Sequence, residues 1–409
     1  MYWAGSPIAC AKHGRMRIQS IYAAALVLVF SACNAAGTNQ SVPSTSTGSG
    51  MAVGAPDSMP ASVFDGVQPA ADHTSILKML NTEKVVSSTV DPLNGDQNPY
   101  GLVYVNNKPF GKSILQKGDL VVCNFNDKSN VQGKGTTIDY MPSVPGSKPT
   151  QLTQSSSLLG CASLTINSFD EVFATNEGAK DAVGDNSNGK IQQTLKSSQL
   201  VEPWGSAYVP SQTGYPPGDG LWVSDASTGK IVRINLGTGG KPTYTPVISG
   251  FAVNKGKPGS ILGPSGLQYN QKTDTLYVVD GVNNTVVAFA HAYNDFNTAN
   301  EVVVGSNGTT FTGPKAKDAK LIYSGAPLSA PVSSTLLPNG NLVIGNTGNQ
   351  KGKNLLVEIA SDGTMLAYKN VNKGNAGALF GIASSGSSDS NTVIYFNNDN
   401  TNTVEVLTK

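Results

Sequence analysis

The sequence is short of charge. Charged residues make up 13% of the 409 residues, and the formal net charge is +1, whereas an average soluble protein has roughly 25% charged residues. A chain this poor in charge is not expected to form a coiled coil, a helical bundle or a charge-rich disordered protein. Its net charge gives no electrostatic argument for binding to nucleic acid or to an anionic membrane. Its arginines are Arg15, Arg17 and Arg233. Because only Arg233 follows the first 32 residues, we expect no nucleic-acid partner.

Histidine is also scarce, with His13, His73 and His291 as the full set. Only His291 falls in the region that we expect to fold, and a single histidine there is interpreted as a surface or packed residue. The sequence has no Gly-x-Ser-x-Gly or His-Glu-x-x-His motif. A hydrolytic triad is therefore not expected.

No apolar run is long enough to span a bilayer. The longest covers residues 21–30, and a spanning helix needs roughly 20 residues. Arg15 and Arg17 precede this run, and Ser31-Ala32-Cys33 follows it, which is the order of a signal peptide. The arrangement resembles the bacterial lipoprotein signal, which implies cleavage after residue 32 and lipidation of Cys33. An ordinary cleavable signal is the alternative, and Met16 is a second candidate for the first residue.

A segment rich in Ser, Thr, Gly, Pro and Ala follows, and we interpret residues 33–74 as a disordered tether because it has too few large apolar residues to bury. The protein is thus expected in the bacterial cell envelope, held to the membrane only by lipid and facing the periplasm or the exterior. Cys123 and Cys161 remain in the folding region. They form either a disulfide, which such a compartment permits, or two separately buried thiols.

The sequence is rich in glycine and proline, with 45 and 23 residues respectively. This composition indicates many turns and short strands. Six segments share a pattern of apolar residues ending on Asn or Asp, and successive end residues are 49 to 66 positions apart. A period in this range indicates a solenoid or a propeller. The six end residues are Asn124, Asn176, Asp225, Asp280, Asn346 and Asn397.

Each of these strands is preceded by an entry turn with Gly or Ser followed by apolar residues, as in Pro264-Ser265-Gly266-Leu267. Glycine there lets backbones pass closely where neighbouring units converge. A third strand follows in each repeat, for example residues 191–192 in the second repeat and 286–289 in the fourth, and there is room for a fourth. Four short strands per repeat of about 50 residues is the blade of a β-propeller.

The sixth repeat ends the chain after its third strand. An unpaired edge at that seam would leave the ring open, and residues 84–88 form an isolated strand-like piece before the first repeat. We therefore predict an all-β fold for residues 75–409, a six-bladed β-propeller closed by an N-terminal strand.

Residues 264–289 carry Pro-x-Gly-Leu, then Leu-Tyr-Val-x-Asp, then Asn-Thr-Val-Val, and this pattern resembles an NHL repeat. Residues 220–234 are similar. The resemblance implies a propeller of the NHL or gluconolactonase-like class, whose members serve mostly as binding surfaces. Some relatives are metal-dependent lactonases or lyases, and in these an Asn or Asp near the entry turn contributes to a metal site in the channel.

The residues before the Gly or Ser of the entry turns are poor metal ligands here. Tyr100, Trp204 and Phe380 occupy three of them, and Ala162, Ser265 and Val332 the others. We expect no metal and no cofactor at these positions. The three aromatic residues either form a stacking patch that binds a glycan, a quinone-like ring or a partner's side chain, or they simply pack between blades.

The six Asn or Asp residues that end the second strands are interpreted as turn-closing residues rather than a metal ring. The leading functional hypothesis is a monomeric, non-catalytic scaffold that binds an envelope protein or a small ligand. The alternative is a metal-dependent propeller enzyme of the lactonase or lyase type.

Overall fold

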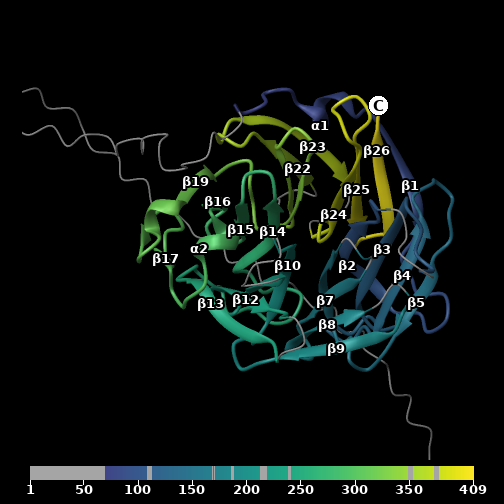
Figure 1. Cartoon of the computed structure of the whole chain (residues 1–409). Coiled ribbons are helices and arrows are strands. Elements are labelled where there is room, and N and C mark those ends of the chain that lie inside the picture. Colours follow the sequence, from purple (N-terminus) through teal and green to yellow (C-terminus); the bar gives the residue numbers. More distant parts are fainter. Residues whose placement is uncertain are drawn as a thin grey trace, which may run out of the picture. The chain divides into compact units, whose positions relative to one another are not determined.

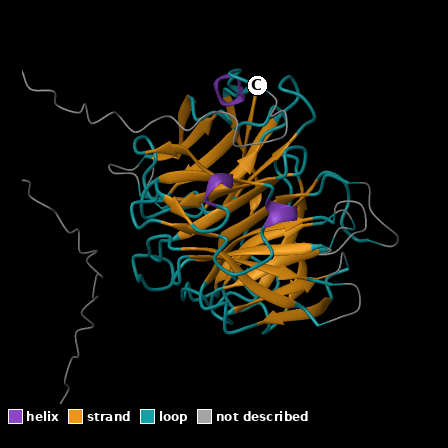
Figure 2. Ribbon diagram, turned by 60° about the vertical axis from the view of Figure 1, so that its left-hand side comes forward, coloured by secondary structure: helices purple, strands orange, loops and turns teal. Residues whose placement is uncertain are grey.

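The computed structural model describes residues 70–107, 113–167, 169, 171–185, 188–211, 219–237, 241–348, 353–372 and 377–409. All of them belong to one of the two structural units of the chain, Met59–Lys409. The predicted signal peptide, Cys33 and most of the predicted tether lie outside the described residues. Strands are the main regular structure of the described chain, and helices form only a few short segments of it (Figure 2).

Six sheets, each built on four antiparallel strands, surround a common axis, as the six repeats predict, so the all-β six-bladed propeller is confirmed (Figure 1). In the first five blades the first strand in sequence lies on the inside of the ring. In the last blade the inner strand is β24, and β1, from the N-terminal part of the chain, is the outer strand. The strands of the first three blades are β2 (Gln97–Tyr104), β3 (Asp119–Asn126), β4 (Thr137–Pro142) and β5 (Thr150–Gln154); β6 (Cys161–Ile166), β7 (Val172–Asn176), β8 (Asp181–Asp185) and β9 (Ile191–Lys196); β10 (Pro203–Val209), β11 (Gly220–Asp225), β12 (Lys230–Asn235) and β13 (Thr243–Ser249).

The strands of the last three blades follow the same order around the ring. They are β14 (Pro264–Asn270), β15 (Thr275–Asp280), β16 (Thr285–Ala290) and β19 (Ala319–Ser324); β20 (Pro331–Leu336), β21 (Leu342–Asn346), β22 (Asn354–Ile359) and β23 (Met365–Asn372); β24 (Ile382–Ser385), β25 (Val393–Asn398), β26 (Thr403–Thr408) and β1 (Thr82–Ser88).

One strand prediction is wrong. Residues 191–192 belong to the fourth strand of blade 2, and the third strand is β8. Its sequence, Asp-Ala-Val-Gly-Asp, carries two acids and a glycine, so it has little of the β-branched and aromatic content that marks a strand. All five β8 residues are buried between their neighbours.

The ring closes through the N-terminal strand. β1 pairs antiparallel with β26, from Thr82 opposite Thr408 to Ser88 opposite Thr403, and the two strands run side by side in Figure 1. The short helix α1 (Ile76–Met79) precedes β1, and the fully buried carboxylate of Glu358 accepts hydrogen bonds from the amides of its first two residues. This carboxylate therefore fixes the segment before β1 to blade 5.

The long interval before the fifth repeat is explained by an insertion between β16 and β19. It contains helix α2 (Ala292–Asp295), strands β17 (Val302–Val304) and β18 (Phe311–Thr312), and the 3-10 helix η2 (Ala316–Asp318). β17 adds parallel to β13, so the blade 4 insertion extends the sheet of blade 3. No helix among the described residues is long and apolar enough to cross a bilayer.

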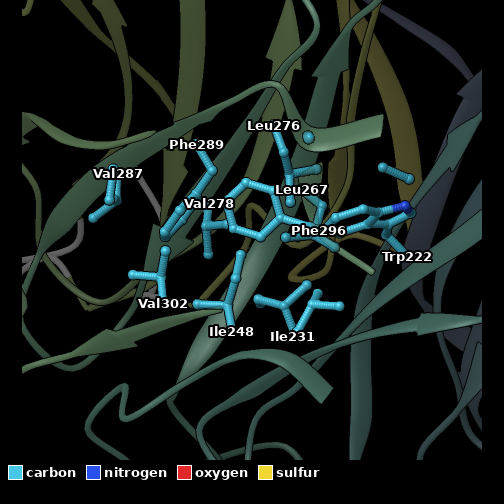
Figure 3. Close-up of a cluster of buried hydrophobic side chains, with 14 of the residues drawn as sticks. Trp222, Ile231, Ile248, Leu267, Leu276, Val278, Val287, Phe289, Phe296 and Val302 are labelled. Atoms are coloured by element: carbon cyan, nitrogen blue, oxygen red, sulfur yellow. The ribbon is translucent and has the colours of Figure 1, made fainter. Parts of the chain in front are cut away.

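The insertion also supplies part of the apolar core between blades 3 and 4. Phe296 packs edge-on between Trp222 and Phe289, with ring centroids 6.2 and 6.1 Å away (Figure 3). The buried guanidinium of Arg233 donates to the backbone carbonyls of Tyr293 and Phe296. The lone arginine after residue 32 thus holds this insertion in place.

Candidate functional site

The inner strands of the six blades, β2, β6, β10, β14, β20 and β24, surround a cavity on the propeller axis. Each of these strands has a ladder partner on one side only, so backbone N–H and C=O groups on the other edge face the axis. The cavity has a volume of about 290 Å³. Its surface is therefore rich in hydrogen-bonding groups even where the side chains are apolar.

Thirty described residues from all six inner strands and their ends line the cavity, and none of them is Asp, Glu, His, Lys, Arg or Cys. The ionisable side chains among them are those of Tyr100, Tyr104, Tyr208 and Tyr269. Burial raises the pKa of each of the first three above its ordinary value. Because phenols ordinarily ionise near pH 10, the described part of the cavity wall is uncharged at neutral pH.

The floor of the cavity is an aromatic cluster built by the entry turns. The ring of Tyr100 is stacked between Phe125 and Phe380, with centroid distances of 4.2 and 4.0 Å. The Trp204 ring is tilted by 50° against that of Tyr100, with centroids 5.6 Å apart. The structure thus brings the three predicted residues together and adds Phe125, which sequence reasoning missed although it directly follows Asn124 at the end of an apolar strand.

Most of this aromatic surface is used for packing between blades. Tyr100 is 1% exposed and Trp204 is 3% exposed, while Phe380 is partly exposed. All three nevertheless line the cavity. The geometry therefore agrees with both sequence-based alternatives, packing between blades and a stacking surface for a ligand. Ligand binding by these rings stays a prediction.

Polar side chains on the cavity wall join neighbouring blades. Ser163 and Ser206 place their hydroxyl oxygens 2.8 Å apart, and the Gln268 amide donates to the Ser334 carbonyl at 2.7 Å. The Ser334 hydroxyl is different, because it is buried and has no hydrogen-bond partner among the described residues. An unpaired hydroxyl on a cavity wall is costly unless a ligand or water completes it.

The entry-turn glycines are where the blades touch. A Cβ on Gly205 would lie 2.0 Å from the carbonyl oxygen of Ser265, and one on Gly381 would lie 2.3 Å from that of Tyr100. Real Cβ atoms do not approach so closely, so no larger residue fits without moving the next blade. The predicted convergence of blades at these glycines is confirmed.

Side chains from the second strands strengthen the same junctions. The Ser224 hydroxyl donates to the carbonyl of Ser265 in the next blade at 2.7 Å, and Thr175 makes the same kind of bond into blade 3. In blade 1 the equivalent residue is Cys123, which forms a disulfide with Cys161 of blade 2. The disulfide thus occupies a junction that hydroxyl groups occupy elsewhere in the ring.

The six Asn or Asp residues predicted to end the second strands are all fully buried, although β3 and β25 continue to Asn126 and Asn398. The turn-closing interpretation holds for Asp225 and Asp280, whose carboxylates accept amide hydrogen bonds from residues two or three positions further on. Asn397 instead donates to the carbonyl of Tyr100, across the junction with blade 1. These contacts are structural, and none of the six lines the cavity.

Acidic residues gather at the entry-turn end of the blades. Glu177 is 3% exposed, and neither of its carboxylate oxygens has a hydrogen-bond partner among the described residues. Burial, with the nearby Glu202 carboxylate, raises the pKa of Glu177 to about 7. Burial raises the pKa of Asp399 to about 7 as well. Neither acid reaches the cavity wall.

Comparison with known proteins places the chain by fold and not by sequence. No protein-family model and no curated protein sequence matches it. A solved structure of a Bacteroides thetaiotaomicron protein of unknown function is similar at 12% identity with a TM-score of 0.50, covering 80% of this chain and 76% of that one.

Catalytically inactive virginiamycin B lyase from Staphylococcus aureus with quinupristin is similar at 15% identity with a TM-score of 0.46, covering 80% of this chain and 99% of that one. A structure described as streptogramin B lyase has 15% identity and a TM-score of 0.44, covering 80% and 86%. At identities this low the comparisons bear on the fold alone, and no sequence family is assigned to the chain.

Proposed function

We propose that this protein is a non-catalytic binding propeller that takes an uncharged, ring-bearing molecule into its axial cavity. The observation that carries the proposal is the chemistry of the wall, where thirty lining residues include no carboxylate, imidazole, ammonium, guanidinium or thiol. A charged ligand would lose its hydration there without gaining an ionic partner, at a cost of several kcal/mol.

The hydrogen-bonding groups of the cavity suit a neutral polar ligand. The inner strand edges offer backbone donors and acceptors, and the Ser334 hydroxyl has no partner among the described residues. The Phe380 ring on the floor is partly exposed and offers a surface for a flat group. A volume of about 290 Å³ lies near the lower end of small-molecule sites.

The alternative of a metal-dependent lactonase or lyase lacks residues to carry it in this cavity. Such chemistry needs oxygen or imidazole ligands, or a general base, within reach of the substrate. The entry-turn positions hold Tyr100, Ala162, Trp204, Ser265, Val332 and Phe380, and no observation at the described cavity wall favours the enzyme over the binding protein.

The test uses two matched probes, phenyl β-glucoside and phenyl β-glucuronide, which differ by a carboxylate. Saturation-transfer NMR should detect the neutral probe on the purified protein and not the charged one. Ser334→Ala should weaken the neutral probe by about tenfold, the value of one hydrogen bond to a buried group. Ser333→Ala is the control, because its hydroxyl already donates to the Leu379 carbonyl. Equal binding of both probes, or no effect of Ser334→Ala, would contradict the proposal.

We further propose that the propeller is anchored in the cell envelope through lipid on Cys33, on the strength of the signal-like order of residues 15–33. Cys33→Ala should release the protein from membranes or leave its signal uncleaved. The measurement is membrane fractionation with mass analysis of the N-terminus. Unchanged attachment and processing in this variant would refute the anchor.

A further inference from the structure

The insertion of blade 4 brings together three side chains outside the axial cavity, those of His291, Asp295 and Asp318. One ligand atom from each lies within 4.8 Å of the others. From this arrangement we propose a binding site for a divalent transition metal of the Zn²⁺ type. The inference goes beyond the proposed ligand binding, because none of these residues lines the axial cavity.

Asp318 supplies the reason why a cation is needed there. Its side chain is 1% exposed, and its Oδ2 atom is shielded from solvent and has no hydrogen-bond partner among the described residues. Its Oδ1 atom lies 3.4 Å from Nδ1 of His291, which is long for a hydrogen bond. A carboxylate removed from water this completely is normally paired with a charge or bound to a metal.

The spacing of the ligand atoms fits a metal between them. Zinc binds imidazole nitrogen and carboxylate oxygen at about 2.0–2.2 Å, so two ligands of a tetrahedral site lie about 3.4 Å apart. The distance from His291 to Asp318 is 3.4 Å. Asp295 is partly exposed, so its side chain can rotate to close the remaining gap. Three protein ligands would leave one position for water or an outside donor.

The Lys315 ammonium is paired with one of the three proposed ligands, Asp295. The ammonium lies 2.8 Å from Oδ2 of Asp295, and both side chains are about one third exposed. A flexible lysine at this degree of exposure can swing into solvent at little cost. The imidazole favours Zn²⁺ over Mg²⁺ or Ca²⁺, which prefer sets of oxygen ligands. Metal binding would displace Lys315 from Asp295 and fasten α2 to η2.

The experiment is calorimetric titration of Zn²⁺ into the purified, chelator-treated protein, with visible absorption of bound Co²⁺ as a second readout. We expect one equivalent to bind with an absorption band typical of nitrogen and oxygen ligands. His291→Ala and Asp318→Asn should each weaken binding by at least about 100-fold, since even outer partners of metal ligands cost about 10–100-fold. Lys315→Met should tighten binding, because the competing ammonium is removed.

His73→Ala is the matched control, because this imidazole also lies near a carboxylate, Asp362 at 2.8 Å, and both are well exposed. It should leave the Zn²⁺ stoichiometry and affinity unchanged. The melting temperature without metal checks that Asp318→Asn still folds, and His291→Ala tests the same site through a partly exposed residue. No stoichiometric binding, binding that survives in His291→Ala, or weaker binding in Lys315→Met would overturn the proposal.

Discussion

Removing the disulfide between Cys123 and Cys161 should reveal how much this covalent link between blades 1 and 2 contributes to the stability of the ring. The bond joins blade 1 to blade 2 across 38 residues. In the chain-entropy description, closing a loop of this length lowers the conformational entropy of the unfolded chain. This raises the free energy of the unfolded state by about 4 kcal/mol near room temperature. Cys123→Ala with Cys161→Ala should therefore lower the free energy of unfolding by about 4 kcal/mol.

A second variant uses the other junctions as its guide. In blade 3 the equivalent residue, Ser224, donates its hydroxyl hydrogen to the next blade at 2.7 Å. Cys123→Ser with Cys161→Ala restores such a donor without the covalent bond. It should recover about 1 kcal/mol relative to the double alanine variant, the usual net worth of one hydrogen bond.

The assay is urea denaturation followed by tryptophan fluorescence, since Trp204 and Trp222 are both buried in the native ring. Wild-type protein that is unfolded, reduced and refolded under reducing conditions provides a comparison without any mutation, and it should match the double alanine variant within about 1 kcal/mol. Equal stability of the oxidised wild type and the double alanine variant would refute the reasoning. So would a double alanine variant that is more stable than the serine variant.

Three further perturbations test other parts of the structure. Trp204→Ala should lower the free energy of unfolding by about 3–5 kcal/mol because it empties a buried site in the aromatic floor; an unchanged Tm would show that the ring does not hold the blades together. Burial raises the pKa of Glu177 to about 7 from an ordinary value of 4.5, so stability should fall as pH rises from about 4.5 through 7, and Glu177→Gln should gain about 3 kcal/mol at pH ~8 and almost nothing at pH ~4 in urea titrations. Deleting residues 34–69 should leave Tm unchanged, whereas deleting residues 34–90 removes β1 from β26 and should destabilise the whole ring; equal melting of both truncations would contradict N-terminal closure.

The sequence by itself determined the fold class, the number of blades and the way the ring closes. Apolar strands that end on Asn or Asp repeat six times, and the last repeat stops one strand short, which identified residues 84–88 as the closing strand. Periodicity of this kind is visible because each blade must bury the same faces against its neighbours. The strand β8, whose place in blade 2 was predicted wrongly, is buried by its surroundings rather than by its own composition.

The sequence predicted only part of the candidate site. Tyr100, Trp204 and Phe380 stood out because they occupy equivalent turns, but their stacking with Phe125 depends on distances around the axis. The unpaired hydroxyl of Ser334 depends on which groups the neighbouring blades present. No local pattern separates it from Ser333, whose hydroxyl is fully used.

Tertiary structure alone decided the blade 4 insertion and its side-chain cluster. His291 is the N-cap of α2 and Asp295 is the last residue of that helix. Asp318 belongs to η2, which two short strands separate from α2 in the sequence. They meet because β17 pairs with β13 of the preceding blade, and the antiparallel pair of β17 and β18 then returns the chain toward α2. Contacts of this kind arise from sheet pairing between distant segments, and their residue spacing therefore carries no motif that a single sequence could reveal.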